Sequence, residues 1–188
     1  MEAINIIEGP ISFLDRSDVD TDQIIPKQFL KRVERTGFGE FLFYDWIRDG
    51  EIELAPHPVL VSGANFGSGS SREHAVWALQ QFGFKAVIAP SYSDIFYSNC
   101  TKNGFLPVEL PQEACQAIAA SGAVRIDLEN QTVSWDGGDA RFEIDGEIKR
   151  RLLGGLDDIA LTLADEHLVE AFEAGPGGSY GPDTTTLP

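Results

Sequence analysis

The run 67–75 reads Gly-Ser-Gly-Ser-Ser-Arg-Glu-His-Ala and brings together the residue types that hold a small anion. It follows an apolar stretch and precedes a segment with helical spacing, a pattern that predicts a strand, a glycine loop and a helix start. Glycine lets the backbone turn tightly and approach a ligand, and the first amides of a helix attract anions. The guanidinium of Arg72 can hold a carboxylate through two parallel hydrogen bonds. The loop is therefore predicted to bind an anionic small molecule beside a serine hydroxyl.

Several known ligand-binding loops share part of this pattern, but the run 67–75 lacks a residue that defines each of them. A P-loop needs a lysine before its Ser or Thr, and 67–75 contains none. The dinucleotide-binding fingerprint needs a third small residue where Arg72 stands. The nucleophile elbow Gly-x-Ser-x-Gly is also missing. The structural alternative that remains open is that Ser70 or Ser71 only caps the following helix.

The glycine loop and a series of further motifs resemble the swivelling domain of the aconitase superfamily. Within that superfamily they are most similar to the small subunits of bacterial 3-isopropylmalate dehydratases. The likeness spans roughly residues 3–174, and its motifs lie in order at 19–26, 35–39, 42–46, 69–75, 87–91, 94–96 and 155–157. Ala64 and Ser68 depart from the residues that are often found in this subfamily, at positions that we do not assign to the chemistry.

This resemblance implies a hydro-lyase that converts 2-isopropylmalate into 3-isopropylmalate through 2-isopropylmaleate, in leucine biosynthesis. By its place in the motif, Ser70 is expected to be the catalytic base and to act as an alkoxide. Ser71 and Arg72 are expected to bind the substrate, Arg72 by clamping one of its carboxylates. Asp22 is expected to organise the same site through hydrogen bonds. No residue of the chain is assigned to a metal.

The cysteine content bears on the cofactor that the resemblance implies, a [4Fe-4S] cluster acting as Lewis acid. Iron–sulfur clusters are held mainly by several cysteine thiolates. The chain has only Cys100 and Cys115, which are far apart in sequence and are predicted to be small buried hydrophobes on helices. We therefore expect that this chain binds no cofactor and is active only with a large subunit that carries the cluster.

Composition and charge narrow the class of protein and of partner. The 188 residues, 43% hydrophobic, fit a single globular domain, expected over 1–174, and the Gly-, Pro- and Thr-rich segment 175–188 is expected to be a flexible tail. A net charge of −16 argues against nucleic acid and anionic membranes as partners. The absence of a long apolar run, a signal-peptide pattern or paired cysteines predicts a cytoplasmic location.

A basic segment interrupts this acidic chain directly after the motif at 19–26. It contains Lys27, Lys31, Arg32 and Arg35. Together with Arg72 these side chains would form a positive pocket for an anionic substrate, and the alternative is a solvated helix face.

Two other classes of function remain open at this point. One is a related hydro-lyase that acts on homoaconitate or on 2-methylmalate and citraconate. The other is a non-catalytic subunit in which the glycine loop only binds an anion.

The expected fold is α/β: helices flank a mixed sheet, as in the swivelling β/β/α domain that the resemblance implies. Strands are predicted at 59–61, 86–89 and 105–110, and helices at 72–82, 91–102 and 111–120. A second β layer is predicted from an antiparallel meander at 124–128, 132–135 and 141–144 and from two N-terminal strands within 4–14 that turn at Gly9-Pro10. The remaining predictions are a loop at 15–22, a short helix at 27–33 and a long helix at 157–174.

Overall fold

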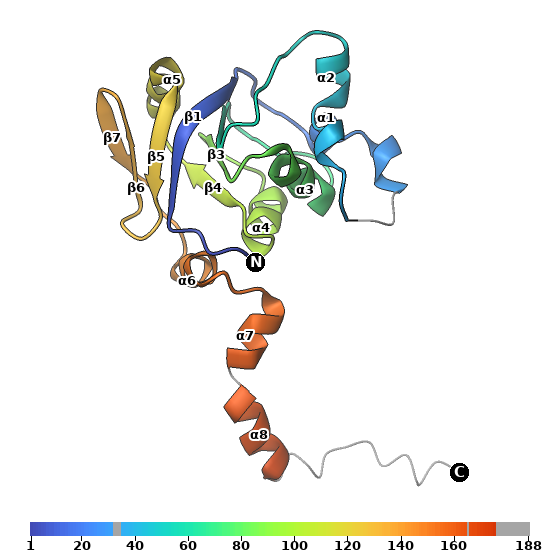
Figure 1. Ribbon diagram of the computed structural model, residues 1–188, viewed down its shortest axis with the longest axis vertical. Coiled ribbons are helices and arrows are strands. Elements are labelled where there is room, and N and C mark those ends of the chain that lie inside the picture. Colours follow the sequence, from blue (N-terminus) through green and yellow to red (C-terminus); the bar gives the residue numbers. More distant parts are fainter. Residues whose placement is uncertain (32–34, 165, 176–188) are drawn as a thin grey trace.

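The computed structural model describes residues 1–31, 35–164 and 166–175, which form the mixed α/β fold shown in Figure 1. Arg32 and almost all of the predicted C-terminal tail lie outside the described residues. Seven strands form one sheet in the order β4-β3-β2-β1-β5-β6-β7. Their bounds are β1 Ile6–Leu14, β2 Val59–Ser62, β3 Ala86–Ala89, β4 Leu106–Glu109, β5 Ala123–Asp127, β6 Thr132–Trp135 and β7 Gly138–Arg141. Strands β1 to β4 are parallel and the rest pair antiparallel, which confirms the predicted mixed sheet. The predicted second β layer is wrong, because β5 pairs with β1 and the meander therefore continues the same sheet.

Helices cover this sheet and extend beyond it. Their bounds are α1 Thr21–Ile24, α2 Tyr44–Arg48, α3 Glu73–Phe82, α4 Asp94–Lys102, α5 Gln112–Ser121, α6 Gly146–Gly154, α7 Asp158–Ala164 and α8 Glu166–Ala174. Two short 3-10 helices, η1 Lys27–Lys31 and η2 Gly39–Phe41, lie between α1 and α2. Helices α1, α2 and α3 gather on the side of the molecule opposite β7 (Figure 1).

Strand β1 is a correction to the predicted pair of N-terminal strands. It is one strand whose first half pairs antiparallel with β5 and whose second half pairs parallel with β2. Gly9 permits the change of partner because its φ is +146° and because a Cβ there would lie 2.9 Å from Pro58 Cγ. The Gly9-Pro10 dipeptide therefore marks an exchange of neighbours within one strand, and the antiparallel half is continuous with the parallel half.

The central strands β2 and β3 are buried along their whole length, and their alternating side chains point into the two faces of the sheet. Leu60 and Val87 join the cluster under α3 and α4, whereas Val59 and Ile88 join the cluster under α5 and α6. Burying one such side chain stabilises the fold by about 1.5–3 kcal/mol. Strand β4, which contains Pro107, lies at the sheet edge, where a missing amide is tolerated.

Two local predictions were wrong because capping and turn residues decide the boundaries. The end of the predicted loop 15–22 forms the start of α1, where Asp20 and Gln23 form a reciprocal capping box. Strand β7 comes earlier than the predicted 141–144, because the two-residue Asp136-Gly137 turn brings Gly138 directly opposite Trp135.

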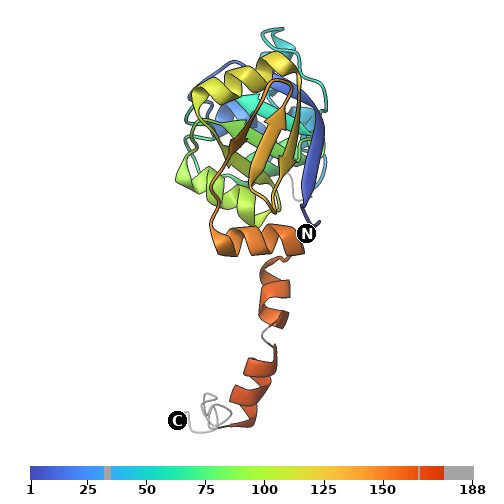
Figure 2. The same ribbon diagram turned by 90° about the vertical axis from the view of Figure 1, so that its left-hand side faces the viewer.

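The C-terminal part differs from the predicted single long helix at 157–174. The sequence reasoning missed α6, whose start is capped by the Asp145 side chain through the amides of Glu147 and Ile148. Helices α7 and α8 follow on either side of residue 165 and lead away from the body of the molecule (Figures 1 and 2). Within the described part of the chain, no helix is long and apolar enough to cross a membrane.

Candidate active site

Two segments that are distant in sequence lie side by side at the candidate site. The carbonyl of Val19 accepts hydrogen bonds from the amides of Gly67 and Ser68, at 2.8 and 3.1 Å. The amide of Thr21 donates to the carbonyl of Ser68 at 2.9 Å, and its hydroxyl donates to the carbonyl of Ser70 at 3.0 Å. The two motifs that the sequence analysis singled out, 19–26 and 69–75, thus form one structural unit.

The glycine loop adopts its path because two glycines take backbone conformations that other residues disfavour. Gly67 has φ +75° and Gly69 has φ +89°. A Cβ at Gly67 would lie 2.1 Å from Phe96 Cγ, so only glycine lets the loop pack against the start of α4. The loop leads from β2 into α3 as the sequence predicts.

Ser70 and Ser71 are both exposed, and neither one caps α3. The residue at the capping position is Arg72, with an extended backbone and no capping hydrogen bond from its side chain. The interpretation of either serine as a helix cap is therefore wrong. Among the described residues, neither serine hydroxyl makes a hydrogen bond, and the first amides of α3 have no side-chain cap. The end of the helix therefore remains available to an anion.

Arg72 and Asp22 form an ion pair beside the serines. Nη1 of Arg72 lies 2.5 Å from Oδ1 of Asp22; the Arg72 side chain is 14% exposed and that of Asp22 52%. The contact is not an aligned hydrogen bond, so this buried nitrogen has no hydrogen-bond acceptor among the described residues. The neighbouring guanidinium lowers the pKa of Asp22, and Lys27 adds a smaller effect in the same direction. Asp22 is therefore a carboxylate at neutral pH and faces the proposed substrate clamp.

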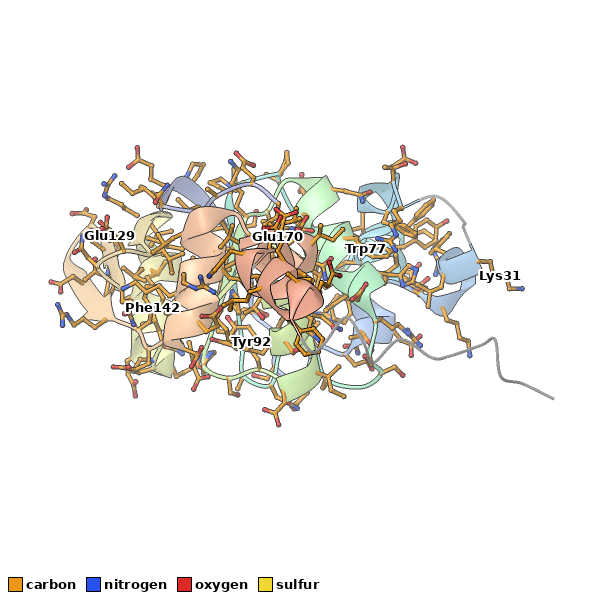
Figure 3. The ribbon with its side chains drawn as sticks, turned by 90° about the horizontal axis from the view of Figure 1, so that it is seen from below. Lys31, Trp77, Tyr92, Glu129, Phe142 and Glu170 are labelled. Atoms are coloured by element: carbon orange, nitrogen blue, oxygen red, sulfur yellow. The ribbon has the colours of Figure 1, made fainter. Side chains whose placement is uncertain are left out.

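Lys27, Lys31 and Arg35, the members of the basic segment that the structure describes, do not gather into the single pocket that the sequence suggested. Lys27, the first residue of η1, contributes to the lowered pKa of Asp22. Lys31 projects outward from η1 at the edge of the molecule (Figure 3). The guanidinium of Arg35 lies 5.4 Å from the ring centroid of Trp77, on α3.

The cysteines and histidines of the described residues do not form a metal-binding set. No group of three or more His, Cys, Asp or Glu side chains within 1–31, 35–164 and 166–175 is placed to hold a metal ion. Cys100 and Cys115 are buried in different core clusters, and burial raises the pKa of both thiols, that of Cys115 to about 11. Nδ1 of His57 contacts a backbone carbonyl at 2.8 Å, and the ring of His74 packs edge-on against a phenylalanine. The contacts of His57 and His74 are therefore with groups of the fold itself.

Comparison with known proteins places the chain in a family. The family model of the aconitase C-terminal domain matches residues 52–113, which include the glycine loop. A 3-isopropylmalate dehydratase small subunit from Halalkalibacterium halodurans is 54% identical, over 93% of this chain and 98% of that protein. This chain belongs to the family of 3-isopropylmalate dehydratase small subunits.

Other members of the family support the same assignment. The small subunit from Rhodopirellula baltica is 48% identical over 94% of this chain and the whole of that protein. A crystal structure of 3-isopropylmalate dehydratase from Methanocaldococcus jannaschii aligns with a TM-score of 0.70 and 28% identity, over 89% of this chain and 99% of that one. The resemblance and the fold inferred from the sequence are thereby confirmed.

The structure brings Ser70, Ser71, Arg72 and Asp22 to one place, as the sequence analysis expected. It also adds a residue that the sequence reasoning missed. Thr21 lies within the 19–26 motif, but nothing in the sequence pattern indicated that its hydroxyl reaches the loop of Ser70.

Proposed function

We propose that this chain is the small subunit of a hydro-lyase that interconverts 2-isopropylmalate and 3-isopropylmalate through 2-isopropylmaleate in leucine biosynthesis. Membership of the small-subunit family, at 54% identity over nearly the full length, supports this function over the related hydro-lyases. Within the site, one observation carries the proposal. An exposed serine with an uncommitted hydroxyl, Ser70, lies two residues from the guanidinium of Arg72, at an uncapped helix start.

In this proposal Ser70 Oγ is the base that removes the proton from the carbon next to a substrate carboxylate. A serine hydroxyl is a very weak acid, so its alkoxide needs stabilisation by positive charge and by helix-start amides. The guanidinium of Arg72 and the uncapped start of α3 supply both. In the reverse direction the hydroxyl of Ser70 returns the proton.

The other site residues hold the substrate in this scheme. Arg72 binds a carboxylate with its planar guanidinium, and Ser71 orients the same group through its hydroxyl. Asp22 keeps the guanidinium in place through the ion pair. The charge that develops on the substrate during proton removal is thereby met by a fixed cation.

The proposed Lewis acid is a [4Fe-4S] cluster on a large subunit, where it would assist the departure of hydroxide. Membership of a small-subunit family supports a large-subunit partner, and the exposure of Ser70, Ser71 and Asp22 supports a site that this second chain completes. The two buried, widely separated thiols do not suit cluster ligation by this chain. A cytoplasmic location accompanies the proposal, because free cysteines suit a reducing compartment.

The test compares Ser70→Ala with Ser71→Ala in the complex with a large subunit, purified without oxygen and assayed for 2-isopropylmaleate. Loss of a general base commonly lowers kcat by about 10²–10⁴-fold, and we expect that loss for Ser70→Ala. Ser71→Ala should lose less, because its role is orientation. Circular dichroism of both variants serves as the folding control.

Two outcomes would contradict these assignments. A larger loss for Ser71→Ala would move the base to that residue. Activity within a few-fold of the original for both variants would favour a subunit that only binds an anion. A substrate panel that includes homoaconitate and 2-methylmalate tests the related hydro-lyases, and preferred turnover of either compound would replace the proposed substrate.

A further inference from the structure

The hydrogen bonds between the 19–22 segment and the glycine loop end in a side chain. Backbone bonds connect the two segments from Val19 to Ser68. Beyond Ser68, the hydroxyl of Thr21 donates to the carbonyl of Ser70 at 3.0 Å. Among the residues that the structure describes, this is the single hydrogen bond that reaches the main chain of 69–71.

Thr21 is built to hold that contact at a fixed distance. Its side chain is branched at Cβ, which restricts rotation about χ1, and the residue is 1% exposed. It is the first residue of α1, and the reciprocal bonds between Asp20 and Gln23, at 2.8 and 2.9 Å, fix this helix start. The donor is therefore rigid and shielded from competing water.

The segment that Thr21 holds has little else to order it. Gly69 has no side chain and takes φ +89°, and Ser70 and Ser71 are exposed. A glycine-containing loop of this kind has many accessible backbone conformations. The hydrogen bond from Thr21 to the carbonyl of Ser70 therefore connects this serine to the rigid start of α1.

The same short helix also holds the substrate clamp. Asp22, the neighbour of Thr21, pairs with the guanidinium of Arg72 at 2.5 Å. Helix α1 thus contacts Ser70 through one residue and Arg72 through the next. Because both contacts come from the same short helix, the orientation of Ser70 is coupled to the position of the Arg72 guanidinium.

We propose that Thr21 is a positioning residue: its hydroxyl fixes the main chain of Ser70 and so directs Ser70 Oγ relative to Arg72. The kinetic consequence rests on the proposed function, in which Ser70 is the base. The structural consequence, an ordered Ser70 main chain, does not depend on that function.

The first experiment replaces Thr21 by valine, which keeps the shape of the side chain and removes the donor. In the complex with the large subunit we expect kcat to fall at least about tenfold while KM changes less than about threefold, because misplacing a reacting group mainly affects the transition state. Thr21→Ser keeps the hydroxyl and should restore most of kcat. The matched control is Thr101→Val, which removes another buried hydroxyl that donates to a carbonyl, that of Ser98 at 3.0 Å. It should leave kcat unchanged.

A double-mutant cycle tests whether Thr21 acts through Ser70. With Ser70→Ala already present, Thr21→Val should cost no further kcat, because there is no base left to direct. Additive losses, or equal losses for Thr21→Val and Thr101→Val, would overturn the proposal.

The second experiment separates this proposal from the proposed function. ¹⁵N relaxation of the full chain without a partner should show that the order parameters of the Ser70 and Ser71 amides fall toward about 0.6 in Thr21→Val. They should stay unchanged in Thr101→Val. If Ser70→Ala retains activity but this loss of order is seen, the catalytic role of Ser70 fails and the positioning contact stands. Unchanged order parameters in Thr21→Val would overturn the positioning role itself.

Discussion

At the scale of single residues, the candidate site combines a paired guanidinium and carboxylate with two exposed serines. The guanidinium of Arg72 is mostly buried, whereas its partner Asp22 is half exposed. An ion pair with one exposed partner contributes about 0–1 kcal/mol to stability, because water screens it. Its value here is therefore positional: it sets where the guanidinium of Arg72 lies within the candidate site.

The ion pair predicts a pH dependence for Asp22→Asn. Arg72 holds the pKa of Asp22 below its ordinary value of 3.8, so the carboxylate stabilises the folded state above that pH. This contribution is lost as the pH falls through the lowered pKa. We expect Asp22→Asn to reduce Tm by up to about 4 °C at pH 7, and the difference from the original chain to shrink as the pH is lowered toward 3.

Thermal melts at a series of pH values check this expectation. Asp136→Asn is the control, since Asp136 is exposed on the turn between β6 and β7 and makes no ion pair within the described residues. A difference for Asp22→Asn that grows toward low pH would show that the ion pair is not its cause.

At the scale of elements, glycines decide how strands and helices approach each other. Gly9 lets β1 change partner, and Gly67 lets the glycine loop lie on Phe96 at the start of α4. Gly67 and Gly50 have similar backbone angles, φ +75° and +72°, but a Cβ on Gly50 would meet nothing within 4 Å. The two positions therefore separate backbone strain from steric overlap.

We predict that Gly67→Ala destabilises the chain much more than Gly50→Ala. The positive φ alone costs roughly 1–2 kcal/mol for a residue with a Cβ. At Gly67 the new methyl group would also collide with Phe96 at 2.1 Å, and forcing extra atoms into a packed core adds about 1–3 kcal/mol. Urea unfolding of both variants measures the difference, and equal losses would mean that the loop moves away from α4 without cost.

At the scale of the whole molecule, the chain divides into a packed body and a C-terminal extension. The body contains the sheet with apolar clusters on both of its faces. Helix α8 has no buried residue, and its apolar side chains Leu168, Val169 and Phe172 are between 45% and 63% exposed. Figures 1 and 2 show α7 and α8 directed away from the sheet.

Removing residues 166–188 should therefore change the Tm of the isolated chain by no more than about 2 °C, because helix α8 loses no buried apolar contacts. Leu152→Ala is the contrasting variant: this α6 residue is fully buried, and its truncation should cost about 2–5 kcal/mol. Calorimetry of the two variants provides the measurement. A drop of several degrees on truncation would show that α8 packs against the body in solution.

The sequence by itself determined the family and most strand and helix positions, and it predicted the candidate site residues Ser70, Ser71, Arg72 and Asp22. The strand and helix positions follow from local signals, namely the alternation of apolar residues and glycines at turns. The family and the candidate site residues follow from the resemblance of a series of ordered motifs. The missed helix α6 also carried such signals, since Asp145 caps its start and Gly155 follows its end.

Only the tertiary structure decided which distant groups meet. The partner exchange of β1 depends on β2 and β5, and the sequence showed only Gly9-Pro10, which is equally typical of a turn. The sequence left open whether Ser70 caps the following helix or stands free at its start. The structure decided this question, because Arg72 occupies the capping position of α3. The contact from Thr21 to Ser70 joins residues 49 positions apart, and no local pattern encodes it. Such contacts arise because strand pairing brings loop ends to one edge of the sheet, and that arrangement is a property of the whole fold.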